Sequence, residues 1–358
     1  MRAVNPRKSR YGRSKLLAAR YIVTVRRAAQ FRGMSLPRAA IEWVDDRMSL
    51  RLASERVALL ARVLIVSTFI DDTIRIAFDY DGQVDSMKSV GFGSMASPIL
   101  PVIFVLVQAV GAALTLAGPS PYWIIGTIDL ILWTAAHPFL YAQQENVEFL
   151  VESVSIIGGL LILLSSTREL QAVLPVSGAG ADANGSKRRM DFVQLAGRCC
   201  LSALFVFYAL KGARERLTAL FFRTDESALS GLLEGLLLGM LVPLTALLVM
   251  GMRSRGVAAV LAAAVALGAV HSHPWVYAAF FAPESMQFRL NNVIGYEGVS
   301  VQAWIYASHQ RYFFFQQIST AGALLMLVVQ GPGRIAVEPD QGLLADSVRT
   351  LSGVKGVD

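Results

Sequence analysis

The feature that most constrains the fold is a stretch of 56 residues between Lys88 and Glu145 in which Asp129 is the only charged side chain. A soluble domain carries about 25% charged residues, because polar side chains must cover its surface. The whole chain is 54% hydrophobic and 16% charged. This composition excludes disordered, fibrous and soluble globular proteins, and it predicts an all-α fold, a polytopic bundle of transmembrane helices.

The bundle is expected over residues 57–333, with about eight spans, and seven or nine spans also fit the pattern. The predicted spans are 57–78, 98–118, 122–140, 147–166, 196–212, 229–250, 256–280 and 312–331. A linker at 169–195, which is rich in Gly, Ala and Ser around 175–186, separates two groups of four spans. Lys and Arg gather in the N-terminal arm and in this linker, which puts both termini and the 334–358 tail on the cytoplasmic side.

The N-terminal region is strongly basic, with eleven Lys or Arg and no Asp or Glu in residues 1–41. Residues 1–36 are therefore expected to be a disordered cytoplasmic arm that lies against anionic lipids. An organelle-targeting segment has the same composition, and that interpretation stays open. Residues 37–56 mix apolar and charged side chains, as an amphipathic surface helix does. Because the excess charge belongs to the arm, no nucleic-acid partner is predicted.

Ionisable and polar side chains within the spans are costly in lipid and mark candidate functional positions. The predicted topology places several of them in the non-cytoplasmic half of the bundle: Asp71, Asp72 and Arg75 in the first span, Glu148 and Glu152 in the fourth, Glu234 in the sixth, and Gln316 and Gln317 in the eighth. Five acids against one arginine predict a polar, net-negative cavity that is open on that side. Such a cavity suits a cation, a proton or the free amine of a peptide. The alternative is a simple Asp71–Arg75 pair at i,i+4, with Glu148 at the headgroup level.

Three stretches, at residues 66–75, 158–164 and 314–319 with Gly331-Pro332-Gly333 after the last, resemble the surfeit locus protein four family. The first reads Val-Ser-Thr-Phe-Ile-Asp-Asp-Thr-Ile-Arg, the second Gly-Gly-Leu-Leu-Ile-Leu-Leu, and the third Phe-Phe-Gln-Gln-Ile-Ser. The resemblance covers roughly residues 38–340. The chain departs from the family at its end, where a lone Lys355 replaces a lysine-rich retrieval signal, and in its long basic arm.

The resemblance implies a receptor of the endoplasmic-reticulum membrane, not an enzyme, that cycles to the Golgi or the intermediate compartment. Its expected partners are soluble secretory cargo proteins, coat-protein-II vesicle components and membrane lipids, with a homo-oligomer left open. No cofactor and no metal ion are expected. The cargo-binding residues are hypothesised to be Asp71, Asp72, Arg75, Glu148, Glu152, Phe314, Phe315 and Gln316.

In this hypothesis the acids attract an amine of the cargo, and the two phenylalanines give apolar contact. Two other functions also fit the sequence. One is a proton- or ion-coupled small-molecule transporter that uses the same acids. The other is a DoxX-like membrane subunit associated with redox chemistry.

Overall fold

The computed structural model describes residues 55–117, 121–166, 183–222, 228–283, 285–290 and 298–337. The predicted basic arm, nearly all of the predicted surface helix, residues 169–182 of the predicted linker and the tail from residue 338 on lie outside these ranges. Predictions for those segments therefore stay predictions.

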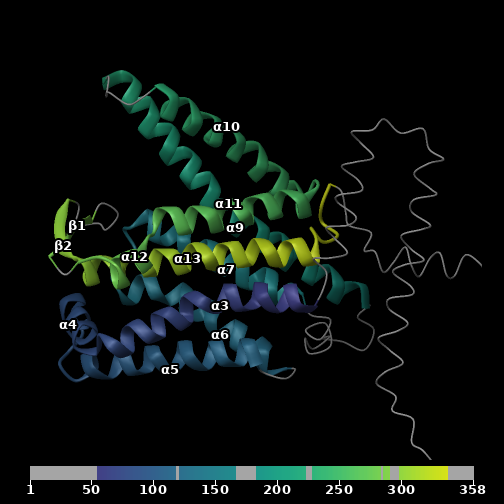
Figure 1. Ribbon diagram of the computed structural model, residues 1–358. Helices are drawn as coiled ribbons and strands as arrows, with labels where there is room; N and C mark the ends of the chain where they lie inside the picture. The colour runs from purple at the N-terminus through teal and green to yellow at the C-terminus, as the bar shows by residue number, and fades with distance from the viewer. Residues whose placement is uncertain are drawn as a thin grey trace, which may run out of the picture. The chain divides into compact units, whose positions relative to one another are not determined.

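Long α-helices dominate the described part of the chain, as Figure 1 shows. Each overlaps one predicted span: α3 (Glu55–Phe78), α5 (Ala96–Ala117), α6 (Tyr122–Leu140), α7 (Val147–Ser165), α9 (Ala183–Phe222), α10 (Ala228–Met250), α11 (Ser254–Ser272) and α13 (Ala303–Gln330). The connections hold two short helices, α4 (Tyr80–Val90) and α12 (Trp275–Phe280), and an antiparallel pair, β1 (Gln287–Leu290) and β2 (Val299–Gln302).

Six of the helical segments in the described ranges are long and apolar enough to cross a membrane. They are α5, α6, α7, α13, residues Met190–Arg214 of α9, and Ser254–Phe280, which joins α11 to α12. The prediction of an all-α helical membrane bundle is confirmed. The helices α3 and α10 complete the predicted set of eight, and the number of crossings remains a prediction.

The linker prediction is wrong for residues 183–195, because α9 begins at Ala183. This first part of α9 is polar in sequence, yet two of its described side chains are buried. Met190 is buried, and Gln194 donates its Nε2–H to the carbonyl of Gly331 at 2.7 Å. A search for apolar runs does not find this part of the helix, because polar side chains such as Gln194 face the protein instead of lipid.

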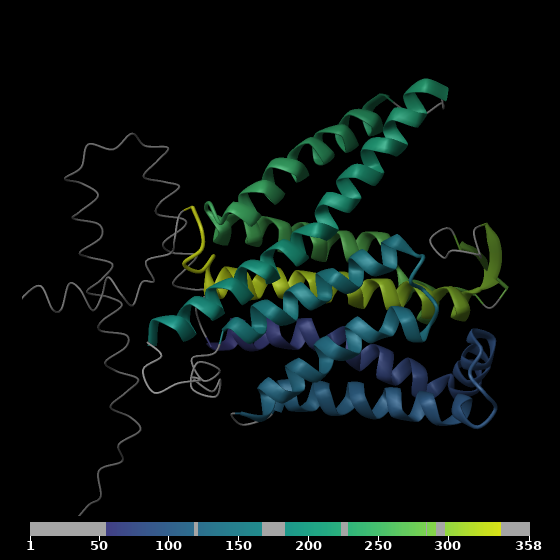
Figure 2. The same ribbon diagram turned by 180° about the vertical axis from the view of Figure 1, so that it is seen from behind.

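The helix α13 lies at the centre of the packing, against α3, α7 and α11. On one side α3 also contacts α5, which pairs with α6, and on the other α7 contacts α9, which pairs with α10 (Figures 1 and 2). Small residues permit this close approach of helices. A Cβ atom on Gly322 of α13 would lie 2.7 Å from the backbone nitrogen of Ile65 in α3, so glycine is required there.

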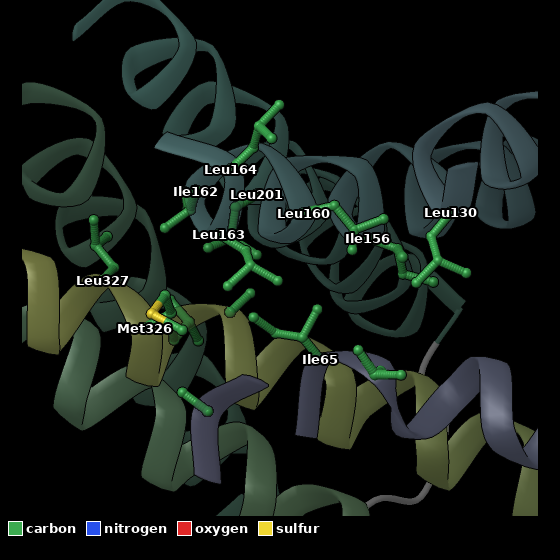
Figure 3. Close-up of a cluster of buried hydrophobic side chains, with 14 of the residues drawn as sticks. Ile65, Leu130, Ile156, Leu160, Ile162, Leu163, Leu164, Leu201, Met326 and Leu327 are labelled. Carbon is green, nitrogen blue, oxygen red and sulfur yellow. The ribbon is translucent and has the colours of Figure 1, made fainter. Parts of the chain in front are cut away.

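A core of large aliphatic side chains holds these helices together, as Figure 3 shows. It includes Ile65 of α3, Leu160 of α7, Leu201 of α9, and Met326 and Leu327 of α13. Lipid-facing positions are apolar too, so complementary packing rather than hydrophobicity alone selects which faces meet.

Candidate functional site

Polar side chains from five helices form a connected group in the half of the bundle that ends at α4, α12 and the β1–β2 pair. We call it the polar network: Asp71, Asp72, Arg75, Gln108, Glu148, Glu152, Tyr208, Lys211, Arg311, Tyr312 and Gln316. It brings together six of the eight predicted site residues. The other two, Phe314 and Phe315, lie elsewhere.

Asp72 lies at the centre of the first part of the network and is only 4% exposed. Its Oδ1 accepts hydrogen bonds from Arg75, at 3.1 Å from Nε and 2.5 Å from Nη2. Its Oδ2 accepts a hydrogen bond from Nε2 of Gln108 in α5, at 2.8 Å. The guanidinium of Arg75 in turn lies over the ring of Tyr312 at 5.3 Å, a cation–π contact between α3 and α13. One carboxylate therefore connects three helices.

Asp71 is also buried, and it pairs with a residue that is distant in sequence. Its Oδ1 lies 2.8 Å from Nε of Arg311 in α13. The alternative of an Asp71–Arg75 pair at i,i+4 is therefore wrong, since Arg75 pairs with Asp72 at i,i+3. The sequence prediction had begun the last span at residue 312, which left Arg311 in a loop, whereas α13 begins at Ala303.

The two glutamates of α7 share one tyrosine. The hydroxyl of Tyr208 in α9 lies 3.2 Å from Oε1 of Glu148 and 3.0 Å from Oε1 of Glu152, so its single hydrogen serves two acceptors. Glu148 also accepts a hydrogen bond from Nζ of Lys211 at 2.9 Å, and its side chain is 35% exposed. Glu148 is thus a partly exposed carboxylate with a cationic partner.

The predicted group of acids is polar and net negative, but these pairings reduce its negative charge. The described network holds four carboxylates and three cations, because Arg311 and Lys211 join Arg75. The fifth predicted acid, Glu234, has a side chain outside the described part. The excess of negative charge is therefore one, not four, and burial is tolerated because most of the carboxylates have a cationic partner.

A cavity of about 30 Å³ lies beside Asp72. Its lining is contributed by five helices: Thr68, Phe69, Asp72, Gln108, Trp133, Thr134, His137, Ser153, Ile156, Tyr312 and Gln316. A water molecule needs about 10–15 Å³ by this measure, so the cavity holds roughly two. It is too small for a peptide segment, so the part of the expected cavity beside Asp72 is not a peptide-sized hollow.

Phe314 and Phe315 both contact Trp275 of α12. The centroid of the Trp275 ring lies 6.0 Å from that of Phe314 and 6.2 Å from that of Phe315. This aromatic cluster, defined by these three residues, is separate from the polar network. Consecutive residues of a helix point about 100° apart, so the Phe-Phe-Gln run presents side chains to different neighbours.

Sequence reasoning missed five members of the network: Gln108, Tyr208, Lys211, Arg311 and Tyr312. Gln108 carried a signal, as a polar residue in a span without charges. The aromatic hydroxyls carried none, because tyrosine is common in and beside membrane helices. In the described ranges, no three His, Cys, Asp or Glu side chains come together in an arrangement that could hold a metal ion.

The chain is similar to members of one known protein family. The model of the SURF4 family matches residues 40–278. A Surfeit locus protein 4 homolog of Schizosaccharomyces pombe is 28% identical over 281 residues, which cover 78% of this chain and 80% of the relative. One of Drosophila melanogaster is 24% identical over 311 residues, covering 85% and 98%. No solved structure matches. The family match includes Asp71, Asp72, Glu148 and Glu152 but ends before α13.

Proposed function

Because the chain belongs to the SURF4 family, we propose that this membrane protein is a non-enzymatic cargo receptor of the early secretory pathway. It binds soluble secretory proteins on the lumenal side of the endoplasmic reticulum and packages them into coat-protein-II vesicles. It then cycles through the Golgi or the intermediate compartment. Family membership is the observation that carries the proposal, and it confirms the resemblance drawn from the sequence motifs.

The proposed orientation follows from the charge distribution. With both termini cytoplasmic, the end of the bundle that holds α4, α12 and the β1–β2 pair faces the lumen. The polar network lies in that half, where cargo arrives.

The contact with cargo is proposed to lie on the surface, because a cavity of about 30 Å³ excludes a peptide. Glu148 is the acid best suited to this role, since its side chain is partly exposed and is paired with Lys211. A free amine of the cargo would replace the Lys211 ammonium at this carboxylate. A partly exposed ion pair contributes up to about 1 kcal/mol, which fits capture that must be reversed in the Golgi.

The remaining predicted residues have different proposed roles. Phe314 and Phe315, with Trp275, offer apolar contact to hydrophobic side chains of the cargo. Asp71, Asp72 and Arg75 are buried and paired, so they position α3 against its neighbours instead of touching cargo.

Proximity labelling from the lumenal side tests this proposal through two substitutions with opposite outcomes. Glu148→Gln removes the acceptor charge and is expected to lower the labelling of a set of secretory proteins. Lys211→Met removes the competing cation and is expected to raise the labelling of the same set.

Asp85→Asn is the matched control, because Asp85 is an exposed acid on α4 that pairs with Lys88 at 2.8 Å. It should leave labelling unchanged. The proposal is wrong if wild type labels no secretory proteins. The surface site is misplaced if all three variants label the wild-type set equally.

A further inference from the structure

We propose that the cavity between α3, α5, α6, α7 and α13 binds one compact monovalent cation, of which Na⁺ is the first candidate. The inference goes beyond the proposed receptor function and does not depend on it, because it concerns a site too small for cargo. Four observations carry it: the size of the cavity, the acceptors that line it, an acceptor without a partner, and the charge of its surroundings.

The size of the cavity limits its occupant. A volume of about 30 Å³ holds one dehydrated or singly hydrated ion, or roughly two waters. Organic ions with several non-hydrogen atoms are too large.

The hydroxyl groups in the lining present lone pairs, not hydrogens. The Ser153 hydroxyl donates to the carbonyl of Phe149 at 2.9 Å, and the Thr134 hydroxyl donates to that of Leu130 at 2.7 Å. Each hydrogen is thereby used within its own helix, and the oxygen remains free to accept. A group of oxygen atoms with free lone pairs favours a hard cation over an anion.

Gln316 supplies the acceptor that has no partner. In this orientation of the amide, its Nε2 donates to the hydroxyl of Tyr312 at 3.0 Å. Its Oε1 is buried and accepts no hydrogen bond, although the residue lines the cavity and is only 6% exposed. A buried carbonyl oxygen without a partner is unfavourable, so a ligand that it can bind is expected there.

The charges around the cavity indicate that its ligand carries a single positive charge. Among the described residues, the network has one more carboxylate than cation. Arg75, Arg311 and Lys211 pair with Asp72, Asp71 and Glu148, whereas Glu152 accepts a hydrogen bond from the neutral Tyr208. The titratable groups that face the cavity are Asp72, His137 and Tyr312, with Glu152 adjacent to Ser153. One monovalent cation would balance this excess, and a divalent ion would exceed it.

The test uses the purified full-length protein in detergent. Its thermal unfolding is measured in NaCl and in N-methyl-D-glucamine chloride at equal ionic strength, since the organic cation cannot enter the cavity. A saturable rise in Tm of about 3 °C with Na⁺ is expected, because a ligand that binds the folded state stabilises it. Retention of radioactive sodium on the protein provides a direct readout.

Variants connect the effect to the cavity. Gln316→Leu should abolish the Na⁺-dependent shift in Tm. The milder Ser153→Ala should raise the Na⁺ concentration that gives half of the shift at least tenfold. Gln317→Leu is the matched control on the same helix, since Gln317 contacts His273 at 3.0 Å and does not line the cavity. It should keep the wild-type response.

Each outcome has a defined meaning. An equal rise in Tm with K⁺ or NH₄⁺ would support the cation site and show that it also accepts these larger ions. Identical Tm values in sodium and N-methyl-D-glucamine would overturn the proposal and leave a water-filled cavity. Stabilisation that follows pH but not Na⁺ would overturn it as well, since a proton would then neutralise the network.

Discussion

Asp71 and Asp72 are neighbours in sequence, but they connect α3 to different helices. Asp71 pairs with Arg311 of α13, whereas Asp72 binds Arg75 on its own helix and Gln108 of α5. Adjacent positions on a helix are about 100° apart, so two consecutive acids can bind side chains of two different neighbouring helices. The burial of both carboxylates is tolerated because each has a cation within hydrogen-bonding distance.

Removing one member of a buried ion pair leaves the other charge uncompensated. Asp71→Asn is therefore expected to lower the free energy of unfolding by about 3 kcal/mol, and Arg311→Gln by a similar amount. The double variant should cost clearly less than the sum of the two. Denaturant titration in mixed micelles measures all three.

The exposed pair Asp85–Lys88 is the control for this cycle, and Asp85→Asn should change stability by less than about 0.5 kcal/mol. Additive effects of Asp71→Asn and Arg311→Gln would show that the two residues do not interact.

At the scale of elements, α9 joins the two ends of the bundle. Tyr208 and Lys211 belong to the polar network, while Arg198 is fully buried towards the opposite end. Arg198 donates to the carbonyl of Val249 in the last turn of α10, at 3.2 Å, and to that of Ile335 after α13. The last carbonyls of a helix lack partners within it, and they favour a cation.

Arg198→Met is expected to free the segment after α13, because it removes the donors to both carbonyls. Limited proteolysis should cut residues 331–337 at least several-fold faster than in wild type, and mass spectrometry would identify the site. Arg56→Met on the exposed face of α3 serves as the control. Equal cleavage in both variants would show that Arg198 does not anchor this segment.

The close contact between α7 and α9 depends on Gly158. A Cβ atom there would lie 2.6 Å from the nitrogen of Leu201 and 2.8 Å from the carbonyl oxygen of Gly197, and neither backbone atom can move alone. Gly158→Val is expected to destabilise the protein by about 1–3 kcal/mol by forcing the helices apart. Thermal unfolding in detergent measures the effect.

Gly268 of α11 gives the matched comparison, since nothing lies within 4 Å of a Cβ atom built on it. Gly268→Val should leave Tm near the wild-type value. Equal losses in both variants would point to backbone propensity, not helix contact, as the cause.

For the whole molecule, the predicted spans put the two ends of the bundle on opposite sides of the membrane. Seven predicted crossings, α5, α6, α7, α9, α10, α11 and α13, separate the turn after α4 from the segment after α13. An odd number of crossings puts these two positions on opposite sides of the membrane.

Cysteine labelling tests this topology in a chain whose native Cys199 and Cys200 are replaced by alanine. Ser94→Cys and Val337→Cys are both at exposed positions. In semi-permeabilised cells a membrane-impermeant maleimide should label Val337→Cys at once, and Ser94→Cys after full permeabilisation. Labelling of both from the cytosol would mean an even number of crossings between them, and α10 would be the first helix to reconsider.

The sequence by itself determined the class of fold and the approximate position of its long helices, but not where α9 and α13 begin. A run such as residues 89–144, with Asp129 as its one charge, has no stable arrangement in water, and backbone groups in lipid must be satisfied within helices. The spans follow from this local requirement, and so does the choice of Asp71, Asp72, Glu148 and Glu152 as exceptional residues. The family resemblance rested on the same motifs.

The tertiary structure alone decided which charges meet. Arg311 is 240 positions from Asp71, and Lys211 is 63 positions from Glu148. Nothing local links them. Partner choice depends on how α13 and α9 are rotated and shifted against α3 and α7, which close packing of residues such as Gly322 and Gly158 fixes. For that reason the sequence predicted an acidic hollow, whereas the folded chain has a paired network around a cavity of about 30 Å³.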